Sequence, residues 1–541
     1  MYLWLTAAML IAAVPGWIMA PLGINAFDEP YQILNSFDPL NAVYSPLSAW
    51  LARPYALLND WSFLSFRYLL VVFQFVTIFI AGAYALARSR RPAGVVMVSS
   101  AAMLFCSVFK SVQNLYGWDT WTQLALILII ILFLSFFSRP SVAKVLTLGI
   151  LSGIAIPLRL PNVVLFVAVP LLFFCCARLT GGWRRALRDS LLFVTVAAVV
   201  TLFIFILLYG SPGAYLERLH SLPIGVHHPI RLLGTFVKTL LRHGIFFCWV
   251  ALGYWFAELI CRRVSRPGLR LLASAPLCCY FAILMLLSRN VNSPAETSNM
   301  GIAVAWTGIC LMVVRAIHSR NLRLLLTAVA LFVLGSVPAF GSNCGYIKFL
   351  SWPLYPLIFL FLERNVTPAL RRFAICVAVT LLALAFLYFN RPAYLDAELK
   401  NLDYRVELKP FEGMYTGKRQ HELLTEAWRD AKPYMDAGYE LITVRGGNGY
   451  MWELLFMNTN ELARHTFDDW YAFDNPDYVE GLMSKALKAR AEGKKVLFMY
   501  MAWPNEEQPT LLWQSLNRDM VRVVEGRGYS YFTFPESSTI R

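Results

Sequence analysis

The stretch Asn25-Ala26-Phe27-Asp28-Glu29-Pro30-Tyr31 places two adjacent carboxylates directly after residues 1–22, which are almost wholly apolar. Carboxylates are costly at the edge of hydrocarbon, so an acidic pair kept at this place indicates a functional site. The apolar segment is long enough to cross a bilayer as a helix, and it lacks the basic start of a signal peptide. We therefore expect an uncleaved first membrane span, followed by a functional acidic pair.

The composition is that of a polytopic membrane protein. Of the 541 residues, 58% are hydrophobic and only 15% are charged, which lies outside the usual range of soluble domains. The net charge of +15 does not indicate nucleic-acid binding, because the basic residues lie mostly in short clusters between apolar segments, as cytoplasmic loops require. The ten cysteines show no metal-ligand spacing, and we expect them to be small buried hydrophobic residues.

Basic clusters at every second loop predict the topology. The first cluster, at residues 88–91, is placed in the cytoplasm, and the later clusters then recur on the same side. The loop with Asp28 therefore lies on the outer face, where residues 28–37 and 45–58 are predicted to form amphipathic helices along the membrane surface. The thirteen expected spans are 2–22, 66–87, 93–109, 119–138, 143–157, 162–177, 190–209, 244–261, 271–287, 301–317, 324–340, 349–362 and 373–389.

The chain divides into two predicted domains. Residues 1–390 are expected to form an all-α transmembrane module, and the hydrophilic tail, residues 391–541, a small extracytoplasmic α/β domain. Short runs rich in β-branched and aromatic residues predict the strands, and Asp474-Asn475 before Pro476 predicts a helix start. The expected strands are 441–445, 495–500 and 529–534, and the expected helices are 452–464 and 476–492.

Isolated charged residues mark several later outer loops. Asp119 opens the fourth expected span, and single cations follow at Arg159, Arg289 and Lys348. A lone cation at membrane depth needs an anionic partner, and the planar donor fork of arginine suits a phosphate. We therefore expect Arg159, Arg289 and Lys348 to contact the phosphate of a lipid-linked donor.

Taken in order, these motifs resemble the GT-C superfamily of polytopic glycosyltransferases, which includes the protein mannosyltransferases and the aminoarabinose transferase of lipid A. The likeness rests on Asp28-Glu29 with Tyr31 following, on Tyr44-Ser-Pro46-Leu47 before the second surface helix, on Asp119, and on a long outer loop, residues 210–243, after the seventh span. It covers about residues 1–260, the shared core, whereas spans 261–390 vary within the superfamily.

The resemblance implies an inverting transfer from a polyprenyl-phosphate or polyprenyl-diphosphate sugar. It implies that an acidic residue of the first loop is the general base; either Asp28 or Glu29 faces the cavity, and we favour Asp28. Asp119 corresponds to the second acidic position, which supports the site or, in some members, a divalent metal, so that Asp28 and Asp119 would be the ligands of any such cofactor. We further expect substrate contacts from Tyr31, Tyr44, His227, His228 and Tyr346.

One base and one cationic clamp suffice for such a displacement, since a phosphate leaving group needs no proton if cations stabilise it. The expected partners are the lipid-linked donor, a glycan, glycolipid or protein acceptor, and membrane lipids. The outer domain lacks cysteine, which favours a bacterial inner membrane with the site facing the periplasm.

Other interpretations stay open. A ligase or polymerase would move an oligosaccharide from a lipid diphosphate, and a flippase would move a lipid-linked glycan across the membrane. The apolar mid-span positions argue against the transporter. Each charged residue also has a structural alternative, because Asp28-Glu29 suits a helix start, Asp119 an N-cap, and Arg159 contact with lipid headgroups.

Overall fold

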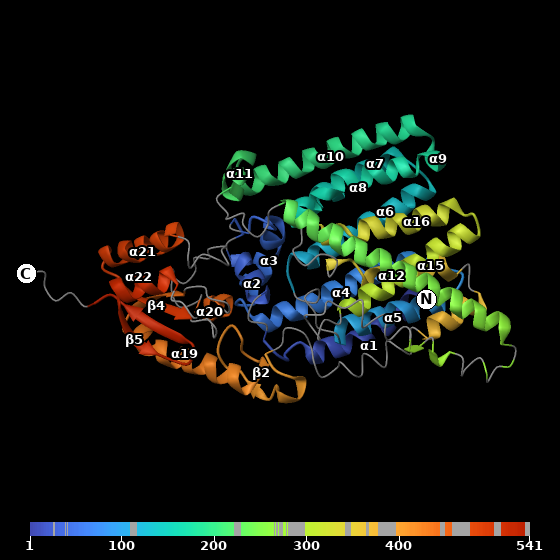
Figure 1. The fold of residues 1–541 in the computed structure, drawn as a ribbon. Coiled ribbons are helices and arrows are strands. Elements are labelled where there is room, and N and C mark those ends of the chain that lie inside the picture. Colours follow the sequence, from blue (N-terminus) through green and yellow to red (C-terminus); the bar gives the residue numbers. More distant parts are fainter. Residues whose placement is uncertain are drawn as a thin grey trace, which may run out of the picture.

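The computed structural model of the 541-residue chain describes residues 1–24, 28–37, 39–40, 42–108, 116–220, 229–264, 266, 269, 274–276, 278–279, 298–340, 348–363, 367–376, 396–443, 449–456, 476–501 and 510–535. Apolar helices pack side by side into one body, and a small sheet with its own helices lies at one end of that body (Figure 1). The chain is thus mostly helical, with a small sheet domain near its C-terminus, as the sequence predicts.

The helical body contains long apolar helices and shorter ones at its ends. Its elements are α1 (Tyr2–Met19), α2 (Asp28–Phe37), α3 (Pro46–Leu58), α4 (Phe63–Leu86), α5 (Pro92–Val108), α6 (Trp118–Ser138), α7 (Val142–Leu158), η2 (Leu160–Val164), α8 (Leu165–Cys175), α9 (Ala177–Thr180), α10 (Trp183–Tyr209), α11 (Pro212–His220), α12 (Pro229–Arg263), α15 (Ser298–His318), α16 (Leu322–Gly335), η4 (Val337–Ala339), η6 (Trp352–Leu354) and α17 (Tyr355–Leu362). The two helices predicted in the first outer loop are confirmed as α2 and α3.

Local sequence explains where several helices begin. Ser62 accepts a hydrogen bond from the amide of Ser65 and so caps α4, and Asn321 caps α16 through the amide of Leu324. Such side chains satisfy amide groups that have no partner within the helix. Pro46 occupies the first turn of α3, where its missing amide hydrogen has no cost.

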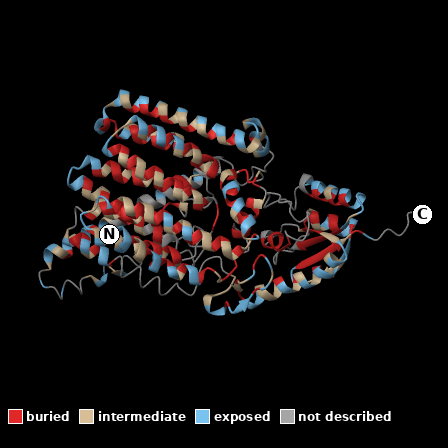
Figure 2. Cartoon of the chain, turned by 180° about the vertical axis from the view of Figure 1, so that it is seen from behind, coloured by how far each residue is buried: buried red, intermediate tan, exposed pale blue. Residues whose placement is uncertain are grey.

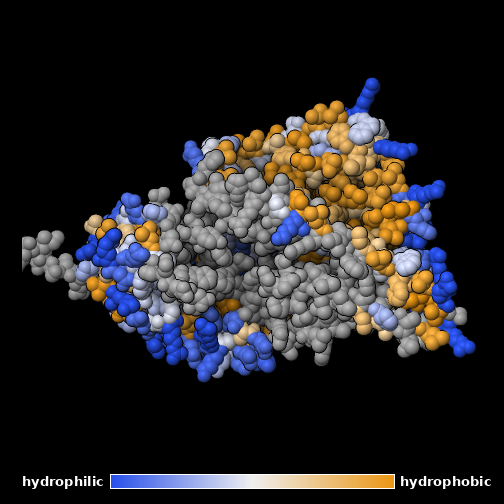
Figure 3. Space-filling model, in the orientation of Figure 1, coloured by the Kyte–Doolittle hydropathy of each residue, from blue (hydrophilic) through white to orange (hydrophobic). Residues whose placement is uncertain are grey.

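Five helices within the described residues are long and apolar enough to cross a membrane. They are Tyr2–Met19, Phe63–Leu86, Asp119–Ser138, Trp183–Tyr209 and Leu322–Ala339. Large apolar side chains of α10, such as Phe203 and Leu207, are exposed, and hydrophobic residues gather over the surface of the helical body (Figure 3). Exposed apolar surface of this extent suits contact with lipid. These features mark an integral membrane protein.

The count of thirteen spans stays a prediction, since the segments 271–287 and 373–389 lie largely outside the described residues. The outer loop predicted at residues 210–243 is helical over most of its length, in α11 and the start of α12, and its position outside the membrane stays a prediction. Arg231, Lys238 and Arg242 interrupt the apolar run there. They argue against burial in hydrocarbon, but arginine and lysine are good helix formers.

A basic cluster lies at one end of the helical body. Helix α9, which contains Arg178, lies at the end remote from the sheet, next to Arg184 and Arg185 at the start of α10 (Figure 1). Helices α2 and α3 lie towards the sheet (Figure 1). This arrangement agrees with the predicted separation of a basic cluster from the acidic loop. The identity of the membrane and the side that each end faces stay predictions.

The C-terminal part contains η8 (Leu399–Asn401), β1 (Tyr404–Arg405), β2 (Tyr415–Thr416), α19 (Lys418–Asp436), β3 (Tyr439–Thr443), α20 (Gly449–Phe456), α21 (Pro476–Ala491), β4 (Lys495–Met501), α22 (Leu511–Asp519), β5 (Val521–Glu525) and β6 (Tyr529–Thr533). Its main sheet has the order β3-β4-β6-β5, with β3 and β4 parallel and the other pairs antiparallel. The strands are largely buried (Figure 2). The sequence predicts three of these strands and misses the exposed edge strand β5.

One hydrophobic cluster joins this sheet to the first outer loop. Ile24, Tyr31 and Leu34 pack in the same buried cluster as Phe411 and Trp452 from the C-terminal part. Helix α20 packs directly against α2. The domain boundary near residue 390 stays a prediction, because residues 377–395 lie outside the described ones. The two parts nevertheless share a core.

Candidate active site

The acidic pair after α1 opens helix α2. Asp28 is the first residue of α2, where the helix dipole favours a carboxylate, and its side chain lies outside the described part of the chain. The neighbouring Glu29 is fully buried and forms a two-pronged ion pair with Arg67 of α4, Nε–Oε1 2.8 Å and Nη2–Oε2 2.8 Å. Glu29 is thus held by an arginine.

Arg67 also fixes the chain on the other side of the acidic pair. Its Nη1 donates to the carbonyl oxygens of Ala20 and Leu22, both at 2.9 Å. The guanidinium is buried, with only 5% of its side chain exposed. A buried arginine needs an anionic partner and acceptors for its remaining protons, and Glu29 with the two carbonyls supplies them. One side chain therefore joins the end of the first span to the start of α2.

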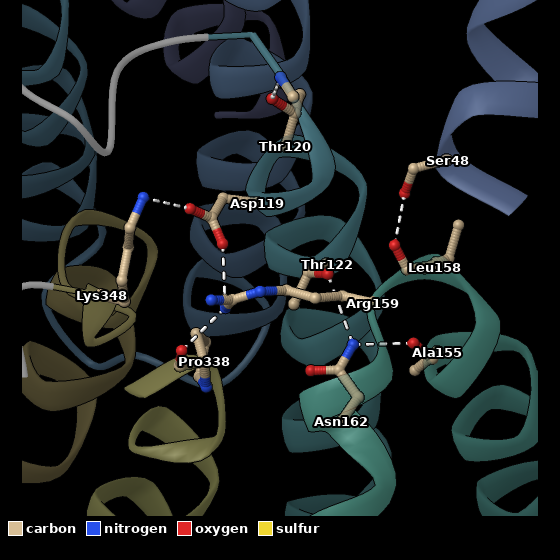
Figure 4. Close-up of polar contacts among 11 residues, drawn as sticks. Ser48, Asp119, Thr120, Thr122, Ala155, Leu158, Arg159, Asn162, Pro338 and Lys348 are labelled. Carbon is tan, nitrogen blue, oxygen red and sulfur yellow. Dashed lines mark hydrogen bonds and ion pairs between the residues drawn. The ribbon is translucent and has the colours of Figure 1, made fainter. Parts of the chain in front are cut away.

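A second buried charge cluster lies at the entrance of α6 (Figure 4). The carboxylate of Asp119 contacts Arg159 through Oδ1, 2.9 Å from Nη1, and accepts a hydrogen bond from Lys348 at Oδ2, 2.7 Å from Nζ. All three side chains are more than nine-tenths buried. The sequence predicts a role for each residue separately, and the structure brings the three together; we call them the charged triad.

The surrounding chain fixes each member of the triad. Asp119 lies in the first turn of α6, where the amide of Gly117 donates to Thr120 Oγ1 at 3.1 Å. Arg159 joins α7 to η2 in extended conformation, and its Nη1 also donates to the carbonyl oxygen of Pro338 at 2.7 Å. Lys348 precedes the buried Phe349. The triad therefore links α6, the α7–η2 junction and the segments that follow α16.

The triad carries one positive charge in excess. Among the described residues, Arg159 uses Nη1 alone as a hydrogen-bond donor, and Lys348 gives one hydrogen bond. Nε and Nη2 of Arg159 and two ammonium protons of Lys348 have no acceptor among the described residues. Charge-assisted bonds to phosphate are among the stronger polar contacts in proteins. The cluster thus offers donors for an anion such as a phosphate, and Asp119 could keep its two contacts if one bound there.

Helix α2, which begins with the acidic pair Asp28-Glu29, and the charged triad are neighbours. Gln32, one turn after Asp28 on α2, packs so tightly on Gly117 that a Cβ there would lie 2.7 Å from Gln32 Cδ. Ser48 of α3 donates to the carbonyl oxygen of Leu158 at 2.7 Å, next to Arg159 (Figure 4). Between α2, α3 and Gly117 lies a cavity of about 10 Å³, room for about one water molecule. The two charged groups thus share the end of the helical body that faces the sheet (Figure 1).

The triad does not fit a divalent metal. Metal ions require carboxylate oxygens that are open to them, whereas a cation contacts each oxygen of Asp119. A metal at Asp119 would face the like charges of Arg159 and Lys348. Within the described parts of the chain, no three of His, Cys, Asp and Glu group together as metal ligands would. The metal expectation gains no support from these residues.

The remaining predicted residues are more dispersed. Tyr31 is buried in the cluster shared with the C-terminal part, which suits packing. Tyr44 is half-buried, and its carbonyl oxygen accepts from the amide of Leu160 at 2.8 Å. The residues Arg289, His227, His228 and Tyr346 lie outside the described parts. Their roles stay predictions.

Sequence reasoning misses Arg67 and Asp396, which both hold the acidic segment. A single arginine within the apolar run Phe63–Leu86 is a recognisable signal, because such a charge is costly unless paired. Asp396 has no comparable signal in the sequence. Its carboxylate accepts from the amide of Ile24, 372 positions away.

Comparisons with known proteins give little. No known protein family matches the chain, and no curated protein matches it. Two solved structures of the Archaeoglobus fulgidus oligosaccharyltransferase are similar to it. One, tethered to an acceptor peptide with the NVT sequon, has a TM-score of 0.44 at 13% identity. The other, in complex with an inhibitory peptide and a dolichol-phosphate, has a TM-score of 0.45 at 12% identity. Each match covers 92% of this chain and 69% of the other. Both TM-scores are too low for a functional inference.

Proposed function

We propose that the chain is an inverting glycosyltransferase of the GT-C type, which moves a sugar from a polyprenyl-phosphate donor to an acceptor at the outer face of the membrane. The observation that carries this proposal is the charged triad, in which Asp119 orients Arg159 and Lys348 side by side in a buried position. An anionic group is the ligand that two such cations favour. A lipid phosphate brings that anion to a membrane-embedded site.

The acidic segment supplies the second component. Both oxygens of Glu29 are bound by Arg67, so an acceptor would have to displace a buried ion pair to reach them. Asp28 precedes this fixed residue and opens α2. We therefore assign the general base to Asp28 and a supporting role to Glu29.

The proposed step balances with these groups alone. Asp28 takes the proton of the acceptor hydroxyl, and the acceptor oxygen forms a bond to the anomeric carbon from the face opposite the phosphate. The bond between that carbon and the phosphate oxygen breaks, and its electron pair stays on the oxygen. Arg159 and Lys348 stabilise the additional negative charge, which makes protonation of the leaving group unnecessary. Asp28 then returns its proton to water.

The acceptor is proposed to be a glycan, a glycolipid or a protein, and the membrane the bacterial inner membrane, with the site and the C-terminal domain in the periplasm. The exclusion of nucleic acid as a partner follows from the placement of the basic clusters between apolar segments.

The test uses the full-length protein in lipid nanodiscs. Polyprenyl-phosphate-linked mannose, glucose and aminoarabinose are the donor probes, and a glycolipid and a peptide are the acceptor probes; the readout is released polyprenyl phosphate. We expect the wild type to release it from at least one donor. Asp28→Asn should lower the rate about 10²- to 10⁴-fold, the usual contribution of a general base.

Asp60→Asn is the matched control, because Asp60 lies in the same outer loop but is exposed and pairs with Lys409 at the surface. It should keep the wild-type rate. Wild-type activity in Asp28→Asn would exclude Asp28 as the base. Consumption of a diphosphate-linked oligosaccharide alone would favour the ligase, and movement of uncleaved donor across the bilayer would favour the flippase.

A further inference from the structure

The chain between the first span and Asp28 is bound by the C-terminal domain. The amide of Tyr415 donates to the carbonyl oxygen of Pro21 at 2.7 Å, and the amide of Gly23 donates back to the carbonyl oxygen of Tyr415 at 2.7 Å. Leu22 and Tyr415 thereby form a parallel bridge. Residues 21–23, shortly before Asp28, therefore form an isolated parallel bridge beside β2.

Asp396 adds a side-chain link at the end of this segment. Its Oδ1 accepts from the amide of Ile24 at 3.2 Å, and its Oδ2 accepts from the amide of Gly417 at 2.8 Å and from the hydroxyl of Thr416. Burial raises the pKa of this carboxyl above its ordinary value, although the amides of Gly417 and Ile24 oppose that shift. Asp396 thus joins the C-terminal domain to the last described residue before the acidic segment.

Two side chains, Arg67 and Asp396, therefore hold the chain around Asp28. Arg67 binds Glu29, which follows Asp28 in the sequence. It also binds the carbonyl oxygens of Ala20 and Leu22, which precede Asp28. Asp396 fixes Ile24 from the other domain. Only three residues separate Ile24 from Asp28, so the span between them covers at most about 14 Å. We infer that loss of either contact loosens the link between Ile24 and the start of α2.

We propose that Asp396 is a positioning residue for Asp28, through which the C-terminal domain completes the active site. This inference rests on the proposed function, in which Asp28 is the base. A base acts efficiently only within hydrogen-bond reach of its proton, and a misplacement of about 1 Å can lower a rate about 100-fold. Among the described residues, the amide of Ile24 is bound by Asp396 and not by Arg67 or the bridge at Tyr415, so substitution of Asp396 removes a contact that the other two do not supply.

The test is Asp396→Asn in the full-length protein. An asparagine side chain has one oxygen and cannot accept from both Ile24 and Gly417, so its NH2 group faces one of the two amides. We expect the asparagine side chain to keep its hydrogen bonds with Gly417 and Thr416 and to lose the hydrogen bond from the amide of Ile24. The kcat for release of polyprenyl phosphate should fall about 10- to 100-fold, while KM for the donor stays within about twofold, because the charged triad is untouched.

Two control variants separate positioning from general damage. Thr416→Val removes a donor to the same carboxylate but leaves the contact with Ile24, and Glu398→Gln removes an exposed charge in the same segment. Both should keep the wild-type kcat. Hydrogen exchange gives a readout independent of activity: the amide of Ile24 should exchange faster in Asp396→Asn and at the wild-type rate in both controls.

The outcomes separate this inference from the proposed function. If Asp28→Asn is inactive while Asp396→Asn keeps the wild-type kcat or the wild-type exchange at Ile24, Asp396 is not a positioning residue. If Asp28→Asn is fully active, the proposed base falls, and a positioning role for Asp396 falls with it, whatever the exchange at Ile24. Should Asp396→Asn not fold, Asp396→Glu decides, because its longer side chain displaces Ile24 and should also lower kcat with KM unchanged.

Discussion

Arg67 binds Glu29 through two parallel hydrogen bonds of 2.8 Å, in a place that solvent does not reach. The pair connects α4 to α2 across 38 residues of sequence. Both carboxylate oxygens of Glu29 are thus occupied by Arg67, as a structural link between the two helices would require.

The first prediction concerns this pair. Glu29→Gln leaves Arg67 buried without its counter-charge, so the free energy of unfolding should fall by about 3–5 kcal/mol. Thermal unfolding of the purified protein in nanodiscs measures the change. Asp60→Asn breaks the exposed pair with Lys409 and should cost at most about 1 kcal/mol. A Glu29→Gln variant that is inactive but as stable as the wild type would make Glu29 a catalytic group after all.

The second prediction concerns phosphate binding at the triad. Lys348→Met removes one of the two cations and should weaken binding of polyprenyl phosphate by roughly 10- to 150-fold, as expected for a hydrogen bond between charged groups. Native mass spectrometry of nanodiscs loaded with polyprenyl phosphate gives the affinity. Arg53→Gln, on the exposed side of α3, is the control and should leave it unchanged. Unchanged affinity in Lys348→Met would remove the triad from the donor site.

The third prediction concerns the contact between α2 and the start of α6. A Cβ at Gly117 would overlap Gln32, so Gly117→Ala should cost about 1–3 kcal/mol, as overpacking usually does. Adding Gln32→Ala should recover part of this loss, with a coupling of about 0.5–3 kcal/mol between the two positions. Gly213→Ala is the control, because its nearest neighbour lies 3.7 Å away. Additive effects of the two substitutions would show that the positions do not touch.

The fourth prediction concerns pH. Burial lowers the pKa of Lys485 in α21 from 10.5 to about 8, and the attraction of Glu453 only partly opposes the shift. The folded state therefore releases this proton before the unfolded chain does, so the free energy of unfolding should rise between about pH 8 and pH 10.5. The double variant Glu453→Gln/Lys485→Met removes both charges and should lack this rise. Thermal unfolding of both proteins from pH 7 to pH 10.5 tests it, and parallel pH profiles would contradict it.

The fifth prediction concerns orientation. If the basic clusters face the cytoplasm, alkaline phosphatase fused after residue 541 should be active in a bacterial host, and a fluorescent protein fused there should stay dark. A fusion of each reporter after Ser319, beside the cluster at Arg320 and Arg323, should give the reverse result. Fluorescence from the C-terminal fusion would invert the whole topology and place the site in the cytoplasm.

The importance of single charged residues within apolar sequence could be predicted, but the residue with which each one pairs could not. Asp119, Arg159 and Lys348 are each recognisable as lone charges between apolar segments. Their meeting depends on how α6, α7 and α16 pack, since Asp119 and Lys348 are 229 positions apart. The periodicity of one segment carries no information about such a contact. For the same reason the pairing of Glu29 with Arg67 could not be predicted.

The C-terminal part shows the same limit. Strands with strong apolar content, such as β4 and β6, could be predicted from local pattern. The exposed edge strand β5 has the mixed sequence Val-Arg-Val-Val-Glu, because only partly buried positions constrain it. Helix α19 buries only Leu424, Ala427 and Ala431, a narrow stripe that is easily overlooked. Docking of this part onto the first outer loop has no local signature at all.

The shared core has a consequence for biosynthesis. Ile24 leaves the ribosome 372 residues before Asp396, and at roughly 5–20 residues per second this delay lasts roughly 20 to 75 s. During that time the apolar side chains of the first outer loop lack the partners that cover them in the finished protein. The loop completes its core only after the C-terminal part has been made and moved to the same side of the membrane. A truncated or stalled chain could therefore insert its helices but would leave this core incomplete, so the last part to be made decides when the first outer loop is finished.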